Sequence, residues 1–438
     1  MGIFNQIIQF FFSLSILVIL HEFGHYVFAR LFNTRVEKFY LFFNPWFSLY
    51  KIKRGDTEYG IGWLPLGGYV KISGMIDESM DTDQVKKPVQ PYEYRAKPAW
   101  QRFLIISGGV LVNFILAIGI YIMVLYTWGE EYLPTDNLEY GVACHPLAKE
   151  IGFKNGDKIV SVDGEKVESF FQIAPSIVIE GAKEVQVERD GKEEEVYIDS
   201  KHIPELLKTP TLFEPRFPLI VDRVAEGSAA EAAGLKSGDK LMAINGYEAS
   251  FFDQYKDTVE AYKNQPVNLT MSRNNNEVNL TVDVPETGVI GIYSASLSNF
   301  IELESKEYSF IQAIPAGIRH GANMVSSYLK QLKLVFSPKT KAYESVGGFI
   351  TIGSIFPKTW DWQSFWNLTA LISIILAIMN MLPIPALDGG HMMFLIYEMV
   401  SGRKPSDKFM EIAQVAGMLF ILALVLFANA NDVAKLFK

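Results

Sequence analysis

Four long stretches of this sequence lack charged side chains and are rich in leucine, isoleucine, valine and phenylalanine. They are residues 3–20, 103–127, 362–387 and 412–431. A helix needs about 20 apolar residues to cross the hydrocarbon core of a bilayer. The sequence therefore predicts a polytopic α-helical membrane protein with four spans.

Positive charge in the connecting loops predicts the orientation of the chain. The last two stretches are separated by Arg403, Lys404 and Lys408. The first two are separated by Arg30, Arg35, Lys38, Lys51, Lys53, Arg54, Lys71, Lys86, Lys87, Arg95, Lys97 and Arg102. Loops rich in lysine and arginine stay in the cytoplasm. Both termini, and the segment between the second and third spans, are therefore expected outside the cytoplasm.

Composition limits the remaining classes of function. The net charge of −9 gives no reason to expect a nucleic-acid partner. Cys144 is the single cysteine, so a secreted scaffold held together by internal disulfides is excluded. Hydrophobic residues make up 49% of the chain, which suits a few spans joined to substantial folded mass outside the bilayer.

A repeated pattern between the second and third spans predicts two copies of one β-rich module. GFKNGDKIVSVDG at 152–164 matches GLKSGDKLMAING at 234–246, with Gly, Gly, Asp, Lys and Gly recurring at an offset of 82. Each copy reads as a turn, a short alternating strand and an Asx-Gly turn. The pattern resembles the bacterial PDZ domain, which binds extended peptides at a sheet edge. Peptide binding and steric gating both stay open as roles.

Two further segments are expected to contact the membrane portion or its surface. Residues 59–75 are rich in glycine and β-formers with Pro65 in the middle, which predicts a hairpin-like β element. Residues 308–336 mix apolar positions with basic ones and predict an amphipathic helix. That helix is expected either at the membrane surface or packed on the soluble modules.

The sequence HEFGH at 21–25 places ionisable side chains inside the first apolar stretch, where they are costly and mark functional sites. On a helix, His21 and His25 face the same way, and two neutral imidazoles at this spacing can take two corners of a tetrahedral zinc site. Glu22 can reach a water at that site and act as general base. The alternative is three ordinary polar residues of a soluble helix.

A zinc site of this kind needs a third protein ligand. Glu37 and Glu58 are nearest but lie in the charged loop. Asp388 is the better candidate, because it ends the third apolar stretch in NMLPIPALDGGH, where a lone carboxylate needs a partner. Pro383 and Pro385 break the helix before it, and unwound backbone at membrane depth is tolerated only inside protein or beside a wet cavity. The alternative is a turn that ends the span at the cytoplasmic surface.

The two motifs together resemble the site-2 protease family of intramembrane zinc metalloproteases. The family joins HExxH in one span to a distant N-x-x-P-x-P-x-L-D-G, and every fixed position of the second motif is present between Asn380 and Gly389. With tandem PDZ-like modules between the second and third spans, the chain resembles the regulator-of-sigma-E protease subgroup. The resemblance covers nearly all 438 residues.

This resemblance implies Zn2+ as the cofactor, bound by His21, His25 and Asp388, with Glu22 as the catalytic glutamate. The implied chemistry is attack of a zinc-activated water on a peptide carbonyl, with Glu22 as general base. The implied substrates are transmembrane segments of single-span proteins, either anti-sigma factors already cut by another protease or remnant signal peptides. The implied location is the bacterial inner membrane, with the PDZ-like domains in the periplasm and the active site toward the cytoplasmic side.

Four more residues are candidates for substrate binding or for stabilising the oxyanion. They are Asn380, Asn113 in GGVLVN, and Gly67 and Gly68 in the segment 59–75. That segment resembles the membrane-reentrant β-loop of the family, which can pair with an unwound substrate strand. The amide of Asn380 is an oxyanion donor or, alternatively, a helix-end cap.

The expected fold class is thus a four-span helical membrane protein with a membrane-associated β-hairpin loop and two extracytoplasmic β-rich domains. The predicted segments are the first span (1–30), a cytoplasmic loop (31–102), the second span (103–128), two PDZ-like domains (129–213 and 214–287), a linker with the amphipathic helix (288–361), the third span (362–390), a second cytoplasmic loop (391–411), and the fourth span with the tail (412–438). A membrane-anchored PDZ scaffold and a zinc-dependent transporter are the competing functions. An intact ligand set with Glu22 disfavours the scaffold, and the spans lack the further carboxylates of a transport relay.

Overall fold

The computed structural model describes residues 2–65, 67–75, 88–207, 209, 211–337, 340 and 346–437. The chain forms two compact units. The helical unit comprises residues 1–129, 307–333 and 343–438, and the β unit comprises residues 130–306 and 334–342. The predicted segments 1–30, 31–102, 59–75, 129–213, 288–361 and 412–438 each include residues outside the described ranges.

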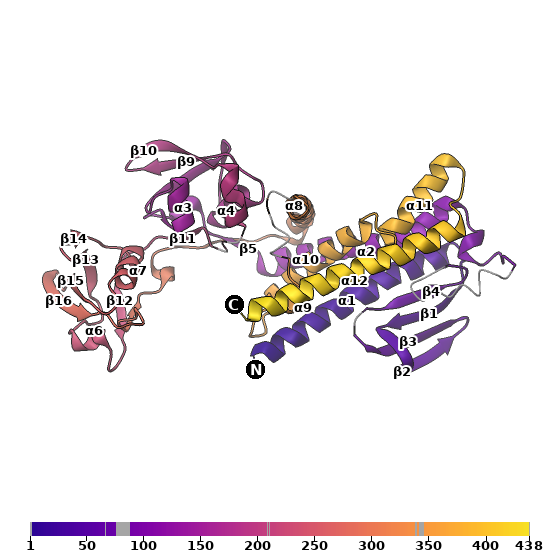
Figure 1. Cartoon of the computed structure of the whole chain (residues 1–438), viewed down its shortest axis with the longest axis horizontal. Helices are drawn as coiled ribbons and strands as arrows, with labels where there is room; N and C mark the ends of the chain where they lie inside the picture. Colours follow the sequence, from indigo (N-terminus) through magenta and orange to yellow (C-terminus); the bar gives the residue numbers. More distant parts are fainter. Residues whose placement is uncertain are drawn as a thin grey trace. The chain divides into compact units, whose positions relative to one another are not determined.

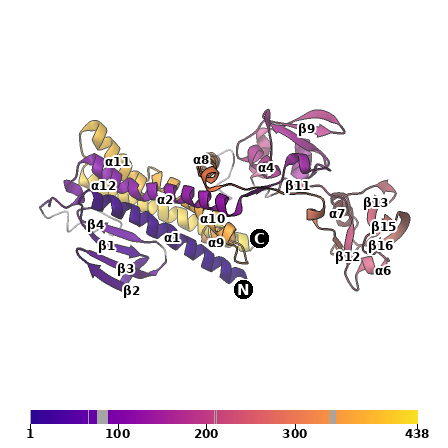
Figure 2. The same cartoon turned by 180° about the vertical axis from the view of Figure 1, so that it is seen from behind.

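Within the described residues, four helices are long and apolar enough to cross a membrane. They are α1 (Gly2–Leu31), α2 (Ala99–Trp128), α10 (Trp362–Met381) and α12 (Asp407–Leu436). Three of them contain a whole predicted apolar stretch, and α10 contains residues 362–381 of the third stretch. Together with the β-sheets they agree with a membrane protein carrying β domains. Figures 1 and 2 show α1, α2 and α10 running side by side, with α2 packed against both of the others.

Glycines allow α1 and α2 to approach closely where they cross. A Cβ atom on Gly24 would lie 2.2 Å from the main-chain oxygen of Gly108, and one on Gly108 would lie 2.6 Å from the oxygen of Gly24. Small residues at such crossings let the backbones of spanning helices touch. The crossing lies within the HEFGH motif, so it fixes the part of α1 that bears the histidines against α2.

A four-stranded sheet follows α1. Its strands are β1 (Val36–Leu41), β2 (Phe43–Arg54), β3 (Thr57–Leu64) and β4 (Tyr69–Ile72), in the order β2-β3-β1-β4. The prediction of a hairpin at 59–75 is wrong in its pairing, because β3 pairs in parallel with β1, and β4 pairs antiparallel with the other side of β1. The earlier strand β1 fills the place between them, which leaves β4 at an edge of the sheet next to α1 (Figure 1).

The predicted third span is interrupted. Helix α10 ends at Met381, residues 382–387 are not helical, and α11 (Asp388–Ser401) begins at the aspartate of the motif. The predicted span 362–390 therefore ends earlier as a helix, and the predicted loop 391–411 holds most of α11. Gly389 and Gly390 make this turn possible, because a Cβ on either would lie within 2.4 Å of main-chain atoms of the segment 381–385.

The amphipathic helix α8 (Phe310–Val335) packs against α2. A Cβ on Gly317 would lie 2.6 Å from Ile122, and Met324, Val325 and Tyr328 pack against the apolar cluster shared by α2 and α10. A short helix, α9 (Phe349–Ser354), packs against α12. The structure thus places α8 on a predicted span, and its location relative to a membrane surface stays a prediction.

The β unit contains two modules built in the same way, as the repeat predicts. The first has strands and helices β5 (Glu130–Tyr132), β6 (Val142–Cys144), α3 (Pro146–Ile151), β7 (Lys158–Val162), β8 (Glu165–Lys166), α4 (Phe170–Val178), β9 (Glu184–Arg189), β10 (Lys192–Tyr197), α5 (Ile203–Leu206) and β11 (Phe213–Pro215). The second has β12 (Val221–Val224), α6 (Ala229–Ala232), β13 (Lys240–Ile244), β14 (Tyr247–Glu248), α7 (Phe252–Ala261), β15 (Pro266–Arg273), β16 (Asn276–Asp283) and β17 (Ile292–Ser294). The later strand β18 (Glu304–Lys306) pairs with β5 of the first module. The sheet order β10-β9-β7-β8 in the first recurs as β16-β15-β13-β14 in the second. Each module has its own apolar core.

The aspartate of each GDK repeat has a structural role. Asp239 accepts hydrogen bonds from Arg273 at 2.7 Å and from the Lys236 N–H at 2.9 Å, and its side chain is fully buried. Asp157 does the same with Arg189 and the Lys154 N–H in the first module. These bonds tie the turn before the central strand to the end of its neighbour, so the repeat signals fold rather than chemistry.

Acid is expected to weaken the second module through this aspartate. Burial alone would raise the pKa of Asp239, but Arg273 and the Lys236 N–H outweigh it and hold that pKa below 3.8. The stabilisation is therefore present above the unfolded pKa and is lost as pH falls through the lower folded value. For residues 130–306, Asp239→Asn should lower the free energy of unfolding by about 3 kcal/mol at pH 7, and by less as pH drops below about 3.8. Urea titrations across this range, with exposed Asp283→Asn as the control, measure the difference. A pH-independent difference would contradict the prediction.

Candidate metal centre

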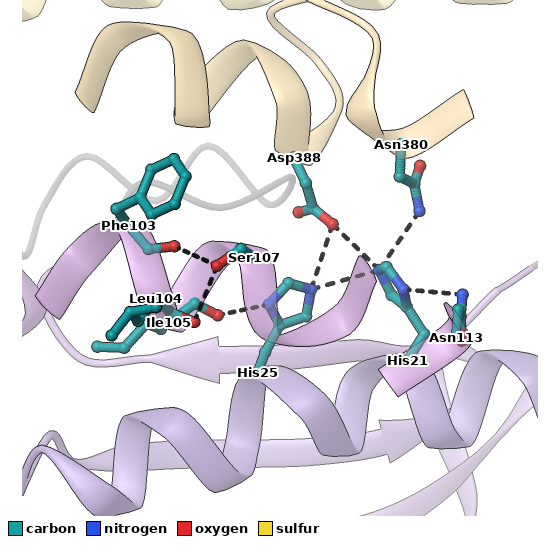
Figure 3. Close-up of polar contacts among 9 residues, drawn as sticks. All are labelled: His21, His25, Phe103, Leu104, Ile105, Ser107, Asn113, Asn380 and Asp388. Carbon is teal, nitrogen blue, oxygen red and sulfur yellow. Dashed lines mark hydrogen bonds and ion pairs between the residues drawn. The ribbon is translucent and has the colours of Figure 1, made fainter. Parts of the chain in front are cut away.

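Three side chains from two distant parts of the sequence converge in the helical unit. His21 and His25 extend from one face of α1, and Asp388 extends from the first residue of α11 (Figure 3). His21 Nε2 lies 3.3 Å from His25 Nε2, and Asp388 Oδ2 lies 3.2 Å from the first and 3.4 Å from the second. The two histidines are buried, and the three atoms form a nearly equilateral triangle.

This triangle fits a tetrahedral zinc site. Bonds of about 2.0–2.1 Å to a tetrahedral ion place neighbouring ligand atoms roughly 3.3–3.4 Å apart, which is the spacing found here. Asp388 Oδ2 is buried and forms no hydrogen bond with any described residue. A buried carboxylate oxygen without a donor is costly unless a cation compensates it. The residues present therefore fit a zinc ion with three protein ligands and one open position.

Each histidine meets α2 through its other ring nitrogen. His25 Nδ1 lies 2.9 Å from the main-chain oxygen of Ile105, so Nδ1 carries the proton and Nε2 presents its lone pair to the metal position. His21 Nδ1 lies 3.2 Å from the side-chain amide of Asn113, which is fully buried. Both rings are thus oriented by α2.

Gly109 gives the two rings room to lie against α2. A Cβ on Gly109 would lie 2.5 Å from His25 Nε2 and 2.7 Å from His21 Cε1, so any side chain there would occupy the space of the rings. The sequence shows this residue as part of an unusual Gly-Gly pair within a span, but its clearance role and the Ile105 contact depend on which face of α2 meets α1. The sequence of α2 alone therefore predicts neither the clearance role of Gly109 nor the Ile105 contact.

Glu22 lies between the metal position and the sheet. Its carboxylate is hydrogen-bonded to the Val70 N–H of β4 and lies close to the side chains of His21, His25 and Asp388. Gly68 lets the chain beside β4 approach α1 here, because a Cβ there would lie 2.7 Å from the Tyr40 carbonyl oxygen and 2.8 Å from Val18 Cγ1 of α1.

Of the four residues predicted to bind substrate or stabilise the oxyanion, three lie near the ligand triangle or Glu22, and Gly67 does not. The amide nitrogen of Asn380, at the end of α10, lies 3.4 Å from His21 Nε2, so the side chain faces the metal position (Figure 3). The side-chain amide of Asn113 contacts the other nitrogen of that ring, Nδ1, and Gly68 lies next to the side chain of Glu22. Gly67 has a φ of +150° and packs against Phe43, with no contact to the three ligands.

The two carboxylates that follow the histidines most closely in the sequence do not reach the ligand triangle. Glu37 accepts a hydrogen bond from Ser73 at 2.9 Å, and Glu58 accepts one from Tyr40 at 2.7 Å, so both are engaged in the sheet. Among the described residues, His21, His25 and Asp388 form the one cluster with metal-ligand spacing.

Comparison with known proteins now identifies the family. Residues 9–424 match Peptidase family M50, and this chain belongs to that family. The predicted membership of the site-2 protease family is confirmed. The chain is therefore a peptidase, and the predicted enzymatic class is confirmed as well.

Similar proteins cover the whole chain. A Neisseria meningitidis protein assigned as a zinc metalloprotease is 29% identical over 462 residues, covering 99% of both chains. Metalloprotease MmpA of Caulobacter vibrioides is 28% identical over 99% of this chain and 96% of its own. Protease RseP of Yersinia pestis is 26% identical over all of both chains. Family and relatives agree with the prediction of a zinc-dependent protease.

Proposed function

We propose that this chain is an intramembrane zinc endopeptidase that cleaves transmembrane segments of single-span membrane proteins. Its predicted substrates are anti-sigma factors trimmed by another protease and remnant signal peptides, within a bacterial inner membrane. The proposed orientation has both termini and the two β modules in the periplasm, and the site toward the cytoplasm. Four spanning-length helices and the similarity to protease RseP support this proposal.

The triangle of His21, His25 and Asp388 carries the proposal. Two nitrogens from α1, a helix apolar enough for a bilayer, and an oxygen from the start of α11 come together at zinc-ligand spacing. We assign these three residues as the zinc ligands. A zinc ion held there supplies a Lewis acid that lowers the pKa of water and polarises the scissile carbonyl.

Glu22 is placed to move the proton. Its carboxylate lies beside the ligand triangle and would accept a proton from the attacking water, then donate it to the leaving amine. The Val70 N–H holds the carboxylate in place. The Asn380 amide is directed at the same region and would donate a hydrogen bond to the developing oxyanion.

The edge strand β4 would hold the substrate. A transmembrane helix buries its amides in hydrogen bonds, so it must unwind locally before a carbonyl can reach the site. The outer edge of β4 faces α1, where the Val70 N–H meets Glu22, and an unwound segment added to that edge would pass the catalytic carboxylate. Gly68 keeps this edge close to α1, whereas Gly67 acts on the sheet through Phe43.

Zinc content tests the ligand assignment. Purified wild-type protein is expected to hold one zinc per chain, and Asp388→Ala should lose most of it, because two histidines alone bind zinc weakly. Elemental analysis after dialysis gives the stoichiometry, with Asp56→Ala, an exposed carboxylate of the same unit, as the control. An equal zinc content in wild type and Asp388→Ala would disprove the long-range third ligand.

A further inference from the structure

The buried amide of Asn113 poses a hydrogen-bonding problem at His21. Its nitrogen Nδ2 lies 3.2 Å from His21 Nδ1, while its oxygen Oδ1 is buried and has no hydrogen-bond partner among the described residues. Asn113 is fully buried, so water does not reach the oxygen from outside. A buried acceptor left without a donor costs about 1–3 kcal/mol.

The same contact is inconsistent with metal binding by His21. A histidine that presents the Nε2 lone pair to a metal carries its proton on Nδ1, and that proton needs an acceptor. His25 has one in the Ile105 carbonyl. His21 has only Asn113, whose NH2 group faces the ring and offers a second donor.

One rotation resolves both problems. The oxygen and nitrogen of an asparagine amide have nearly the same shape, so a half-turn about Cβ–Cγ exchanges them within the same space. Oδ1 then accepts the His21 Nδ1 proton and is no longer without a partner. The main chain at Asn113 is fixed from the other side, because Ser373 Oγ of α10 donates to its carbonyl oxygen at 2.8 Å.

We infer that Asn113 is a positioning residue that accepts the Nδ1 proton of His21 and so keeps Nε2 free for the metal, rather than a group that touches the substrate. This inference rests on the proposed zinc site. It makes Asn113 the counterpart of the Ile105 carbonyl, so α2 supplies one acceptor to each histidine ligand. Partners of this kind typically contribute about 10- to 100-fold to metal affinity.

Two substitutions separate the acceptor from the donor. Asn113→Leu keeps the size and removes both groups, and should weaken zinc binding by about 10- to 100-fold. Asn113→Asp keeps only acceptors at pH 7, and should bind zinc as tightly as wild type or more tightly. Thr369→Val removes a buried hydrogen bond between α10 and α1 without touching the site, and serves as the packing control.

The measurement is competition for zinc between a chelator of known affinity and full-length protein in detergent micelles, with thermal unfolding of the metal-free forms recorded in parallel. Wild-type affinity in Asn113→Leu would overturn the inference. Asn113→Asp provides a second test if Asn113→Leu fails to fold. If Asn113→Asp binds zinc as weakly as a variant that lacks a metal ligand, the amide N–H is the required group, and the inference is overturned. Failure of wild type to bind zinc, or unchanged binding in Asp388→Ala, would instead remove the proposed site and the inference with it.

Discussion

Glu22→Gln is expected to lower kcat by about 100- to 10,000-fold while leaving the zinc content at the wild-type value. The glutamine side chain has the same length and can keep a hydrogen bond to the Val70 N–H, but it cannot accept a proton from water. Because Glu22 contributes no atom to the ligand triangle, the substituted protein should still bind the metal. Cleavage of a purified single-span model substrate in detergent, measured beside elemental analysis of the same sample, gives both quantities.

Measuring cleavage and zinc content together distinguishes a role of Glu22 in proton transfer from a role in metal binding. Loss of cleavage with loss of zinc would show that Glu22 supports the site rather than moving the proton. Cleavage at the wild-type rate in zinc-loaded Glu22→Gln would exclude Glu22 as the general base and leave the catalytic proposal without its carboxylate.

Gly109→Ala is expected to remove both zinc binding and cleavage. The added methyl group would lie 2.5 Å from His25 Nε2 and 2.7 Å from His21 Cε1, closer than any such contact can be. Either the rings must turn away or α2 must move away from α1, and the close Gly24–Gly108 contact beside the rings opposes that movement. A ligand shift of this size should reduce zinc affinity at least about 10-fold, which competition with a chelator measures.

Gly119→Ala is the matched control for this substitution. It lies on the same helix, and nothing lies within 4 Å of where its Cβ would be. Alanine is the better helix former by about 1 kcal/mol, so this variant should fold at least as well as wild type and keep both zinc and cleavage. Equal loss in the two variants would point to a general intolerance of α2 to alanine and not to the space beside the rings.

Much of the site could be predicted from the sequence because its residues combine side-chain type with spacing. His21 and His25 share a helix face by periodicity alone, and an isolated carboxylate at Asp388 after two prolines needs a partner. The comparisons confirm the family that these motifs resemble, and the structure brings the three side chains together. The comparisons also agree with zinc as the cofactor, and the role of each individual residue at the site is a proposal.

The sequence predictions were wrong or incomplete where a strand pairing or a helix contact depends on segments that are distant along the chain. Residues 59–75 have the composition of a hairpin, yet β1 inserts between β3 and β4, and no local property of the segment signals that insertion. Gly109 and Asn113 match the family's G-x-x-x-N pattern, but the space that Gly109 leaves for the rings and the acceptor role of the Ile105 carbonyl were not predicted, for a similar reason. Both act through helix α2, on the face that meets α1, and a single sequence does not specify which faces of two spans meet.

The distance along the chain between the ligands has a consequence for biosynthesis. The histidines precede both β modules along the chain, but Asp388 is made only after those modules and after α1, α2 and α10, three of the four spanning-length helices among the described residues. A nascent chain that does not yet include Asp388 therefore carries Glu22, the proposed general base, without the full set of proposed metal ligands. On the proposed ligand assignment, the metal site can be complete only after α10 and Asp388 have been synthesised.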